Sequence, residues 1–279
     1  MNGKTAIVTG ASSGIGEATA ARLAAAGYQV FGTSRRGAQA GERSFEMLAL
    51  DVTSDRSVEA AVAEVMRRAG RIDLLVNNAG FTVSLGGAEE TSIAQAQSIF
   101  DTNFFGIVRM TRAVVPHMRK QGNGRILNIS SVLGFLPAPY MAIYGATKHA
   151  VEGYSESLDH ELRTRGIRVS VIEPAYTRTQ FEANALEPDT KLDEYREARA
   201  ALGKLMKQKI AEGDEPSVVA EVVVRAATVA RPKLRYTAGG VARRVRLLRQ
   251  FAPARLLDAG IRKDLQLDAI SAPQSLPDR

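Results

Sequence analysis

Short apolar segments alternate with longer amphipathic ones through most of the chain. Seven segments of five or six residues are largely apolar on both faces, as expected of strands in a buried parallel sheet. They are residues 4–9, 28–33, 45–50, 72–76, 125–130, 167–172 and 234–239. Segments with helical periodicity lie between them, at residues 17–27, 55–69, 92–119, 142–165, 191–212 and 216–230. The alternation predicts one doubly wound α/β domain, with helices on both faces of a seven-stranded parallel sheet.

The alternation breaks after Glu173. Residues 175–215 are polar and charged, and we expect them to form a mobile lid over a substrate. The catalytic domain is predicted to span residues 1–238. Residues 239–270 have the pattern of a basic, amphipathic helical extension broken at Pro253, and 271–279 are predicted to be a disordered tail.

Composition narrows the class of protein. The chain has 279 residues and is 45% hydrophobic, without an apolar run long enough to span a membrane. A strand pattern begins at residue 4 and leaves no room for a signal peptide, so we expect a cytoplasmic protein. The absence of cysteine excludes disulfides and thiol nucleophiles, and the three histidines lack the spacing of metal ligands. No metal site is therefore expected.

The net charge of +7 is concentrated near the C-terminus. Residues 231–265 contain ten Arg or Lys and two Asp, while the rest of the chain is close to neutral. We favour a segment that caps the substrate pocket or a subunit edge; peripheral contact with an anionic membrane is the alternative. No nucleic-acid partner is expected, because Tyr236 and Phe251 are the only aromatic residues there.

A glycine-rich loop separates the first predicted strand from the first helix. Gly10, Gly14 and Gly16 allow the backbone to approach a pyrophosphate, and the start of the helix supplies N–H donors and a positive dipole end. The spacing differs from the commoner G-x-G-x-x-G, and an ordinary glycine-rich turn is the alternative interpretation. In this strand–turn–helix context the loop predicts dinucleotide binding, hence a Rossmann-type fold.

The end of the second strand indicates which dinucleotide is bound. Many such folds carry an acid there, which binds a ribose 2′-hydroxyl, whereas this chain has Arg35 and Arg36. Arginine pairs with phosphate through charge and geometry, so NADP(H) is predicted over NAD(H), with Arg35 as the better candidate. Asp51 could accept a hydrogen bond from adenine or could simply cap the next helix.

Tyr144 and Lys148 are candidates for acid–base chemistry. Four residues apart on a helix, their side chains share one face, and the positive charge would lower the pKa of the phenol from about 10. Ser131, at the end of an apolar strand, could hydrogen-bond the substrate oxygen. Taken alone, the Tyr–Lys spacing is also that of a solvated pair on a surface helix.

Together, the ordered motifs resemble those of the classical short-chain dehydrogenases/reductases, over residues 4 to about 238. The motifs are TGASSGIG at 9–16, NNAG at 77–80, Asn103, Ser131 and Y-x-x-x-K at 144–148. Further segments are most similar to the hydroxysteroid and retinol dehydrogenase-like branch. Pro174 is followed by Ala rather than by the usual Gly, which allows the same backbone contacts.

This resemblance implies a role for each motif. Tyr144 would be the acid–base residue, Lys148 would hold the nicotinamide ribose, Ser131 would orient the substrate oxygen, and Asn103 would fix a water that relays protons to Lys148. Asn77, Ala79 and Gly80 would shape the adenosine side of the cofactor site, and Thr179 would hold the nicotinamide carboxamide. The remaining cofactor-binding positions are Ser12, Ser13, Ile15, Ser34, Val52, Pro174 and Thr177.

The predicted function is an NADP(H)-dependent oxidoreductase that interconverts a lipophilic ketone or aldehyde with its alcohol. Loops beyond the strand ends are rich in apolar and aromatic residues, and the candidate substrate contacts are Phe81, Val83, Leu133, Met141, Tyr176 and Phe181. A reductase of carrier-bound 3-oxoacyl thioesters and a non-catalytic dinucleotide-binding regulator are the alternatives. The resemblance also implies a homodimer or homotetramer.

Overall fold

The computed structural model describes residues 3–37, 43–181 and 184–270. Its strands form one seven-stranded sheet in the order β3-β2-β1-β4-β5-β6-β7, and every neighbouring pair is parallel. The strands are Thr5–Thr9 (β1), Gln29–Ser34 (β2), Glu46–Ala49 (β3), Leu74–Asn77 (β4), Gly124–Ile129 (β5), Ile167–Pro174 (β6) and Arg235–Ala238 (β7). The predicted α/β class and seven-stranded parallel sheet are confirmed. The tail predicted to be disordered, 271–279, lies outside the described residues.

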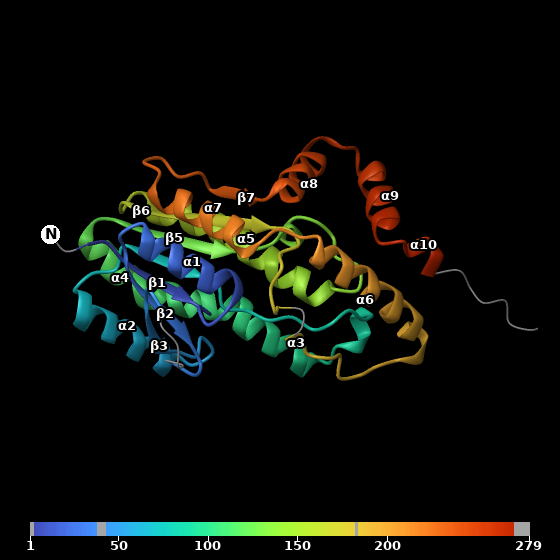
Figure 1. Cartoon of the computed structure of the whole chain (residues 1–279), viewed down its shortest axis with the longest axis horizontal. Coiled ribbons are helices and arrows are strands. Elements are labelled where there is room, and N and C mark those ends of the chain that lie inside the picture. The colour runs from blue at the N-terminus through green and yellow to red at the C-terminus, as the bar shows by residue number, and fades with distance from the viewer. Residues whose placement is uncertain (1–2, 38–42, 182–183, 271–279) are drawn as a thin grey trace, which may run out of the picture.

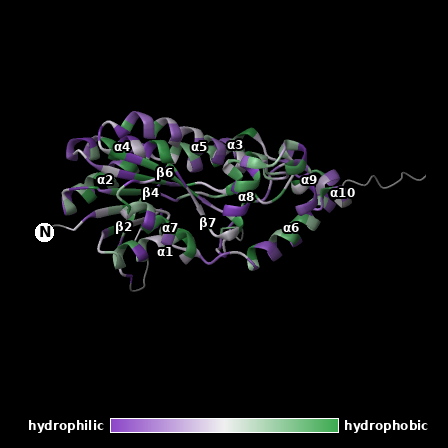
Figure 2. Cartoon of the chain, turned by 90° about the horizontal axis from the view of Figure 1, so that it is seen from above, coloured by the Kyte–Doolittle hydropathy of each residue, from purple (hydrophilic) through white to green (hydrophobic). Residues whose placement is uncertain are grey.

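Helices cover both faces of this sheet, as Figures 1 and 2 show. They are Gly14–Ala25 (α1), Asp55–Ala69 (α2), Ile93–Phe100 (α3), Gly106–Gln121 (α4), Ala142–Arg163 (α5), Arg196–Ala211 (α6), Pro216–Thr228 (α7), Gly240–Phe251 (α8), Ala254–Asp264 (α9) and Leu267–Ile270 (α10). Helices α1 and α7 lie on one face, and α2, α4 and α5 lie on the other. Each face is therefore sealed from water, which explains why the strands are apolar on both sides.

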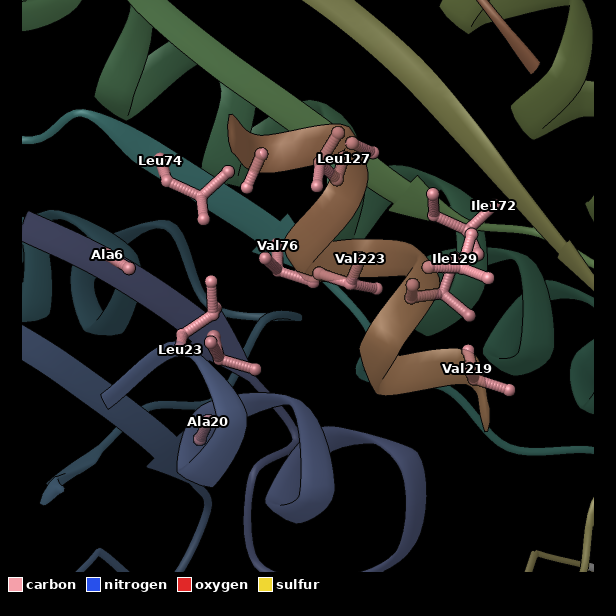
Figure 3. Close-up of a cluster of buried hydrophobic side chains, with 14 of the residues drawn as sticks. Ala6, Ala20, Leu23, Leu74, Val76, Leu127, Ile129, Ile172, Val219 and Val223 are labelled. Carbon is pink, nitrogen blue, oxygen red and sulfur yellow. The ribbon is translucent and has the colours of Figure 1, made fainter. Parts of the chain in front are cut away.

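Two hydrophobic clusters make up the core, one on each face of the sheet. In the first, Leu23 of α1 and Val223 of α7 pack against Val76 and Leu127 (Figure 3). All four side chains are buried to within 1% exposure. Because this packing fixes α1 and the strand ends relative to each other, it also fixes the loops at the carboxyl edge of the sheet.

Local sequence accounts for several helix boundaries. Ser54 caps α2 by accepting a hydrogen bond from the Ser57 N–H at 3.3 Å, and Pro216 begins α7, where its missing N–H is not needed. The segment predicted to be helical over 92–119 comprises α3 and α4, joined by a π-helical turn at Asp101–Phe105. Such turns frequently occur at functional sites, and this one contains Asn103.

The extension after β7 forms helices α8 and α9, which meet at Pro253 as the sequence predicted. Figures 1 and 2 show α8, α9 and α10 at the same end of the molecule as α6. Arg249 anchors α8 by donating a hydrogen bond from Nε to the Phe135 carbonyl at 3.0 Å. Arg246 lies over the Phe135 ring and 3.5 Å from the Glu173 carboxylate. The extension thus attaches to the loop that follows β5 and to the end of β6.

Candidate active site

The carboxyl ends of the strands open into a large cavity of about 1660 Å³. Ligands of open α/β sheets bind at this edge, and one drug-sized ligand typically fills about 300–1,000 Å³. The cavity therefore has room for a cofactor and a substrate together. Most of the residues singled out from the sequence line it: Gly10, Ser12, Ser13, Gly14, Ile15, Ser34, Arg35, Arg36, Asp51, Val52, Ala79, Gly80, Phe81, Ser131, Leu133, Met141, Tyr144, Lys148, Pro174, Tyr176, Thr177, Thr179 and Phe181.

The glycine loop forms a cradle between β1 and α1. Gly10 and Gly14 adopt positive φ angles of 66° and 58°, which favour glycine. Gly16 does not line the cavity; it lies where a Cβ atom would come within 2.2 Å of the Gly10 carbonyl oxygen. Helix α1 can begin this close to the loop because Gly16 has no side chain. Ser13, Gly14 and Ile15, at the start of α1, line the cavity, where the N–H groups of a helix start suit a pyrophosphate.

Two adjacent asparagines at the end of β4 have different functions in the structure: Asn77 is the last residue of the strand, and Asn78 follows it. Asn77 is buried behind the cavity, where its Nδ2 donates to Asn128 Oδ1 at 2.8 Å. Asn78 lines the cavity and donates from Nδ2 to the carbonyls of Thr9 and Gly10, at 2.9 and 3.1 Å. Asn78, which the sequence interpretation did not single out, therefore holds the glycine loop in place. Its position as the first residue beyond the end of β4 was the available signal.

Arg35 and Arg36 follow β2 and line the cavity beside Asp51. The Asp51 carboxylate accepts hydrogen bonds from the N–H and hydroxyl of Thr53, at 3.0 and 2.7 Å. These bonds, with a smaller contribution from the charge of Arg35, lower the pKa of Asp51. Since Ser54 caps α2, Asp51 closes the turn before that helix and keeps an ionised carboxylate at the cavity wall.

Ser131, Tyr144 and Lys148 come together from β5 and α5. Ser131 lies just beyond β5 and begins a short turn at Val132–Gly134, with its hydroxyl accepting from the Leu133 N–H at 3.2 Å. Tyr144 and Lys148 are one turn apart on α5, and the Lys148 Nζ lies 5.6 Å from the centre of the Tyr144 ring. The predicted trio therefore lines a common wall of the cavity.

Burial sets the charge state of Lys148. Its Nζ donates to the Ile129 carbonyl at 2.9 Å, and the residue is 7% exposed. Removal from water disfavours the ammonium and lowers the pKa of Lys148 from 10.5 to about 8. Lys148 thus remains mostly protonated near neutral pH and places a positive charge beside the Tyr144 ring.

Asn103 ties the loop after β4 to the helix that carries Tyr144. Its Oδ1 accepts from the Phe81 N–H at 3.0 Å, and its Nδ2 donates to the Phe81 carbonyl and the Thr147 hydroxyl at 2.8 and 3.3 Å. Thr147 in turn donates to the Tyr144 carbonyl at 2.7 Å. Asn103 is buried and both of its amide hydrogens are used, so the side chain positions the wall of the cavity rather than lining it.

The substrate side of the cavity is apolar and partly aromatic. The Phe181 ring lies 5.8 Å from the Tyr144 ring, centre to centre, and Leu133, Met141 and Tyr176 line the same space. Val83 does not line this cavity: it is buried, forms a bridge with Leu186 and lines a small neighbouring pocket that Met141 and Tyr144 also reach. Helices α6, α8 and α9 also contribute side chains to the cavity, and only the first of these falls within the predicted lid.

The family model for short chain dehydrogenase matches residues 4–190. A 3-ketodihydrosphingosine reductase from Bacteroides thetaiotaomicron is 43% identical over 66% of this chain and 68% of its own, and a retinol dehydrogenase 8 from Bos taurus is 36% identical over 83% and 80%. A short-chain dehydrogenase structure from Streptomyces avermitilis aligns over 98% and 100% of the two chains, with 31% identity and a TM-score of 0.78. The chain belongs to the short-chain dehydrogenase/reductase family, as the resemblance predicted.

Three other similar structures contain nicotinamide dinucleotides. They are 26–28% identical to this chain, with TM-scores of 0.70–0.73, and hold NADH, NADP+ or NAD. The glycine cradle and the start of α1 fit such a cofactor, as do the two arginines beyond β2. None of the described helices is both long and apolar enough to cross a lipid bilayer.

Proposed function

We propose that this protein is an NADP(H)-dependent oxidoreductase that interconverts a lipophilic ketone or aldehyde with its alcohol. The observation that carries the proposal is the presence of Ser131, Tyr144 and Lys148 in one cavity with the glycine loop. A regulator that only senses a dinucleotide has no need of this trio. The names of the relatives, a ketone reductase and a retinol dehydrogenase, support the same class of reaction.

The cofactor site is assigned by the chemistry of its walls. The N–H groups at the start of α1 and the loop Gly10–Gly16 would hold the pyrophosphate, and Thr179 and Lys148 would contact the nicotinamide half. Arg35 and Arg36 supply two positive charges where an acid would otherwise select NAD(H), so they suit a 2′-phosphate. When bound, the dinucleotide supplies the hydride and the protein supplies position and electrostatics.

Ser131, Tyr144 and Lys148 would carry out the acid–base chemistry. In the direction of reduction, Tyr144 donates its proton to the oxygen of the substrate as negative charge develops there. The Ser131 hydroxyl donates a second hydrogen bond that strengthens with that charge. The ammonium of Lys148 stabilises the phenolate that remains. In the reverse direction, the phenolate takes the proton back from the alcohol.

Leu133, Met141 and Phe181 make the space beside Tyr144 apolar, which favours a lipophilic substrate over a sugar. Arg178, the arginine of these loops considered for binding a carboxylate, forms an ion pair with Glu215. We therefore propose a substrate that is an uncharged carbonyl or alcohol at its reacting end; the charged residues Lys209, Arg244 and Asp264 that also line the cavity belong to α6, α8 and α9.

A cofactor-consumption screen tests the proposal. Ketones, aldehydes and sterols would be offered with NADPH and NADH side by side, and each free ketone would be compared with its carrier-bound thioester analogue. We expect turnover of free lipophilic carbonyls with NADPH. Turnover of carrier-bound substrates alone would favour the thioester reductase, for which the basic C-terminal helices could dock an acidic carrier. Cofactor binding without turnover would favour the regulator.

A further inference from the structure

The cavity continues beyond the reacting residues into a space between three helices. Most of the side chains that line this C-terminal chamber from α6, α8 and α9 are apolar, and they include Leu202, Met206, Val245, Leu248, Leu257 and Ile261. The same helices also contribute the charged residues Lys209, Arg244 and Asp264. Ser131 and Tyr144 line the same cavity. The chamber is therefore continuous with the place where the substrate oxygen would lie.

Helix α9 presents apolar side chains to this chamber. Leu257 and Ile261 lie one turn apart and face the cavity, while Arg255 and Arg262 follow the opposite side of the helix. None of the residues of α9 is buried, and Leu256, which also lines the cavity, is 65% exposed. An amphipathic helix normally covers its apolar face, so this face is suited to an apolar ligand.

Polar contacts hold the helices around the chamber. Lys209 of α6 pairs with Asp264 of α9 at 2.8 Å, and its Nζ lies 5.6 Å from the centre of the Tyr176 ring. Arg249 fixes α8 to the Phe135 carbonyl. The helices are thus tied to each other and to the domain by charged groups, and their apolar sides remain available to a ligand.

Resting on the proposed function, we propose that the C-terminal chamber binds the extended alkyl chain of the substrate, whose oxygen lies at Ser131 and Tyr144. A chain in the chamber would cover the apolar faces of α6, α8 and α9. Continuity with the reaction site favours this occupant over a second copy of the protein or a membrane surface, neither of which would need a cavity that reaches Tyr144.

Two adjacent leucines of α8 offer a matched test. Leu247 and Leu248 are 49% and 50% exposed, but only Leu248 lines the cavity. Binding of 1-alkanols with 6 to about 14 carbons would be measured by calorimetry on the full-length protein saturated with NADP+, for the wild type, Leu247→Gln and Leu248→Gln. Because no turnover is required, this readout does not depend on the proposed reaction, whose failure would appear separately in the substrate screen.

We expect Kd to fall about two- to fourfold with each added methylene in the wild type. Leu248→Gln should raise the Kd of 1-dodecanol about tenfold and flatten the dependence on chain length, while Leu247→Gln should change it less than about twofold. A Kd independent of chain length would overturn the proposal. Equal effects of the two substitutions on Kd would also overturn it. The same holds if Leu248→Gln changes the oligomeric state of the protein or its binding to phosphatidylserine vesicles.

Discussion

The ammonium of Lys148 lies 5.6 Å from the centre of the Tyr144 ring and is fixed there by its hydrogen bond to the Ile129 carbonyl. A buried cation at this distance favours the phenolate form of tyrosine. The same burial is unfavourable for the folded protein, because the charged lysine has left water. The charge of Lys148 therefore favours the proposed chemistry at Tyr144 and, at the same time, lowers the free energy of unfolding by an amount that can be measured.

The first prediction concerns that cost. The pKa of Lys148 is about 8 in the folded protein, below its ordinary value of 10.5. Below pH 8 the lysine is charged in both states, and the folded state bears the full cost. Between pH 8 and 10.5 Lys148 keeps its proton mainly in the unfolded state, so the free-energy cost of burying its charge decreases as the pH rises. Relative to Lys148→Met, the unfolding free energy of the wild type should rise by up to about 3 kcal/mol between pH 7 and 10.5.

Denaturant titrations of both proteins across this pH range provide the measurement. A difference between wild type and Lys148→Met that does not vary with pH would contradict the assigned burial of the charge.

Glu173 gives a prediction of opposite sign. It is fully buried near the end of β6, where Arg235 donates a hydrogen bond to its Oε1 at 3.2 Å and Arg246 lies 3.5 Å away. Arg235 is shared with Glu152 and Glu156, and burial raises the pKa of Glu173 to about 7 in spite of the nearby positive charges. The folded state then holds a proton that the unfolded state loses above about pH 4.5, so stability is present at low pH and is lost as pH rises through 7. Relative to Glu173→Gln, the unfolding free energy of the wild type should fall by up to about 3 kcal/mol between pH 4.5 and 8. Thermal unfolding at several pH values checks this, and parallel curves for the two proteins would refute it.

Gly16 is predicted to be essential for the shape of the phosphate loop. A methyl group there would come within 2.2 Å of the Gly10 carbonyl oxygen, so Gly16→Ala should displace α1 from the loop. We expect a loss of about 1–3 kcal/mol in stability together with weaker dinucleotide binding. Gly153→Ala is the control, because Gly153 lies inside α5 with open space around its Cα, and Ala there should be neutral or stabilising. Equal behaviour of the two variants would argue against the close approach.

Arg35 tests the choice of cofactor. Arg35→Ala should raise the Kd of NADPH by about tenfold to a hundredfold, the loss expected for a charge-assisted hydrogen bond, and should leave NADH binding within about twofold. Fluorescence titration with each cofactor measures both values. An equal loss for NADPH and NADH would show that Arg35 does not bind a 2′-phosphate. The same titrations on Arg36→Ala would reveal whether the second guanidinium shares the task.

Much of the fold could be predicted because local signals and packing agree. Apolar segments, glycine turns and helix caps are encoded within a few residues, and α2 begins and ends where the sequence indicated. The places of Ser131, Tyr144 and Lys148 could be expected because they follow from strand ends and helical spacing. Asn77 and Asn78 show the limit: which of two neighbouring amides faces the cavity depends on where β4 ends, and that is decided by the sheet as a whole.

The C-terminal helices show a second limit. Their amphipathic pattern and the break at Pro253 were evident, but the pattern does not say what an apolar face will contact. Lys209 and Asp264 are 55 residues apart in the chain, and their pairing places α9 beside α6. Long-range contacts of this kind determine the extent of the cavity and cannot be derived from periodicity.

Tyr144→Phe tests the central claim most directly. The substitution removes one oxygen atom, so NADPH binding and the unfolding midpoint should be preserved, while kcat for reduction of a ketone that the wild type accepts should fall by about 10²–10⁴-fold. Tyr140→Phe is the matched control, since Tyr140 lies in the loop just before α5 and packs edge-on against Tyr195 outside the large cavity. A kcat for Tyr144→Phe within about twofold of the wild type would contradict the proposed acid–base role.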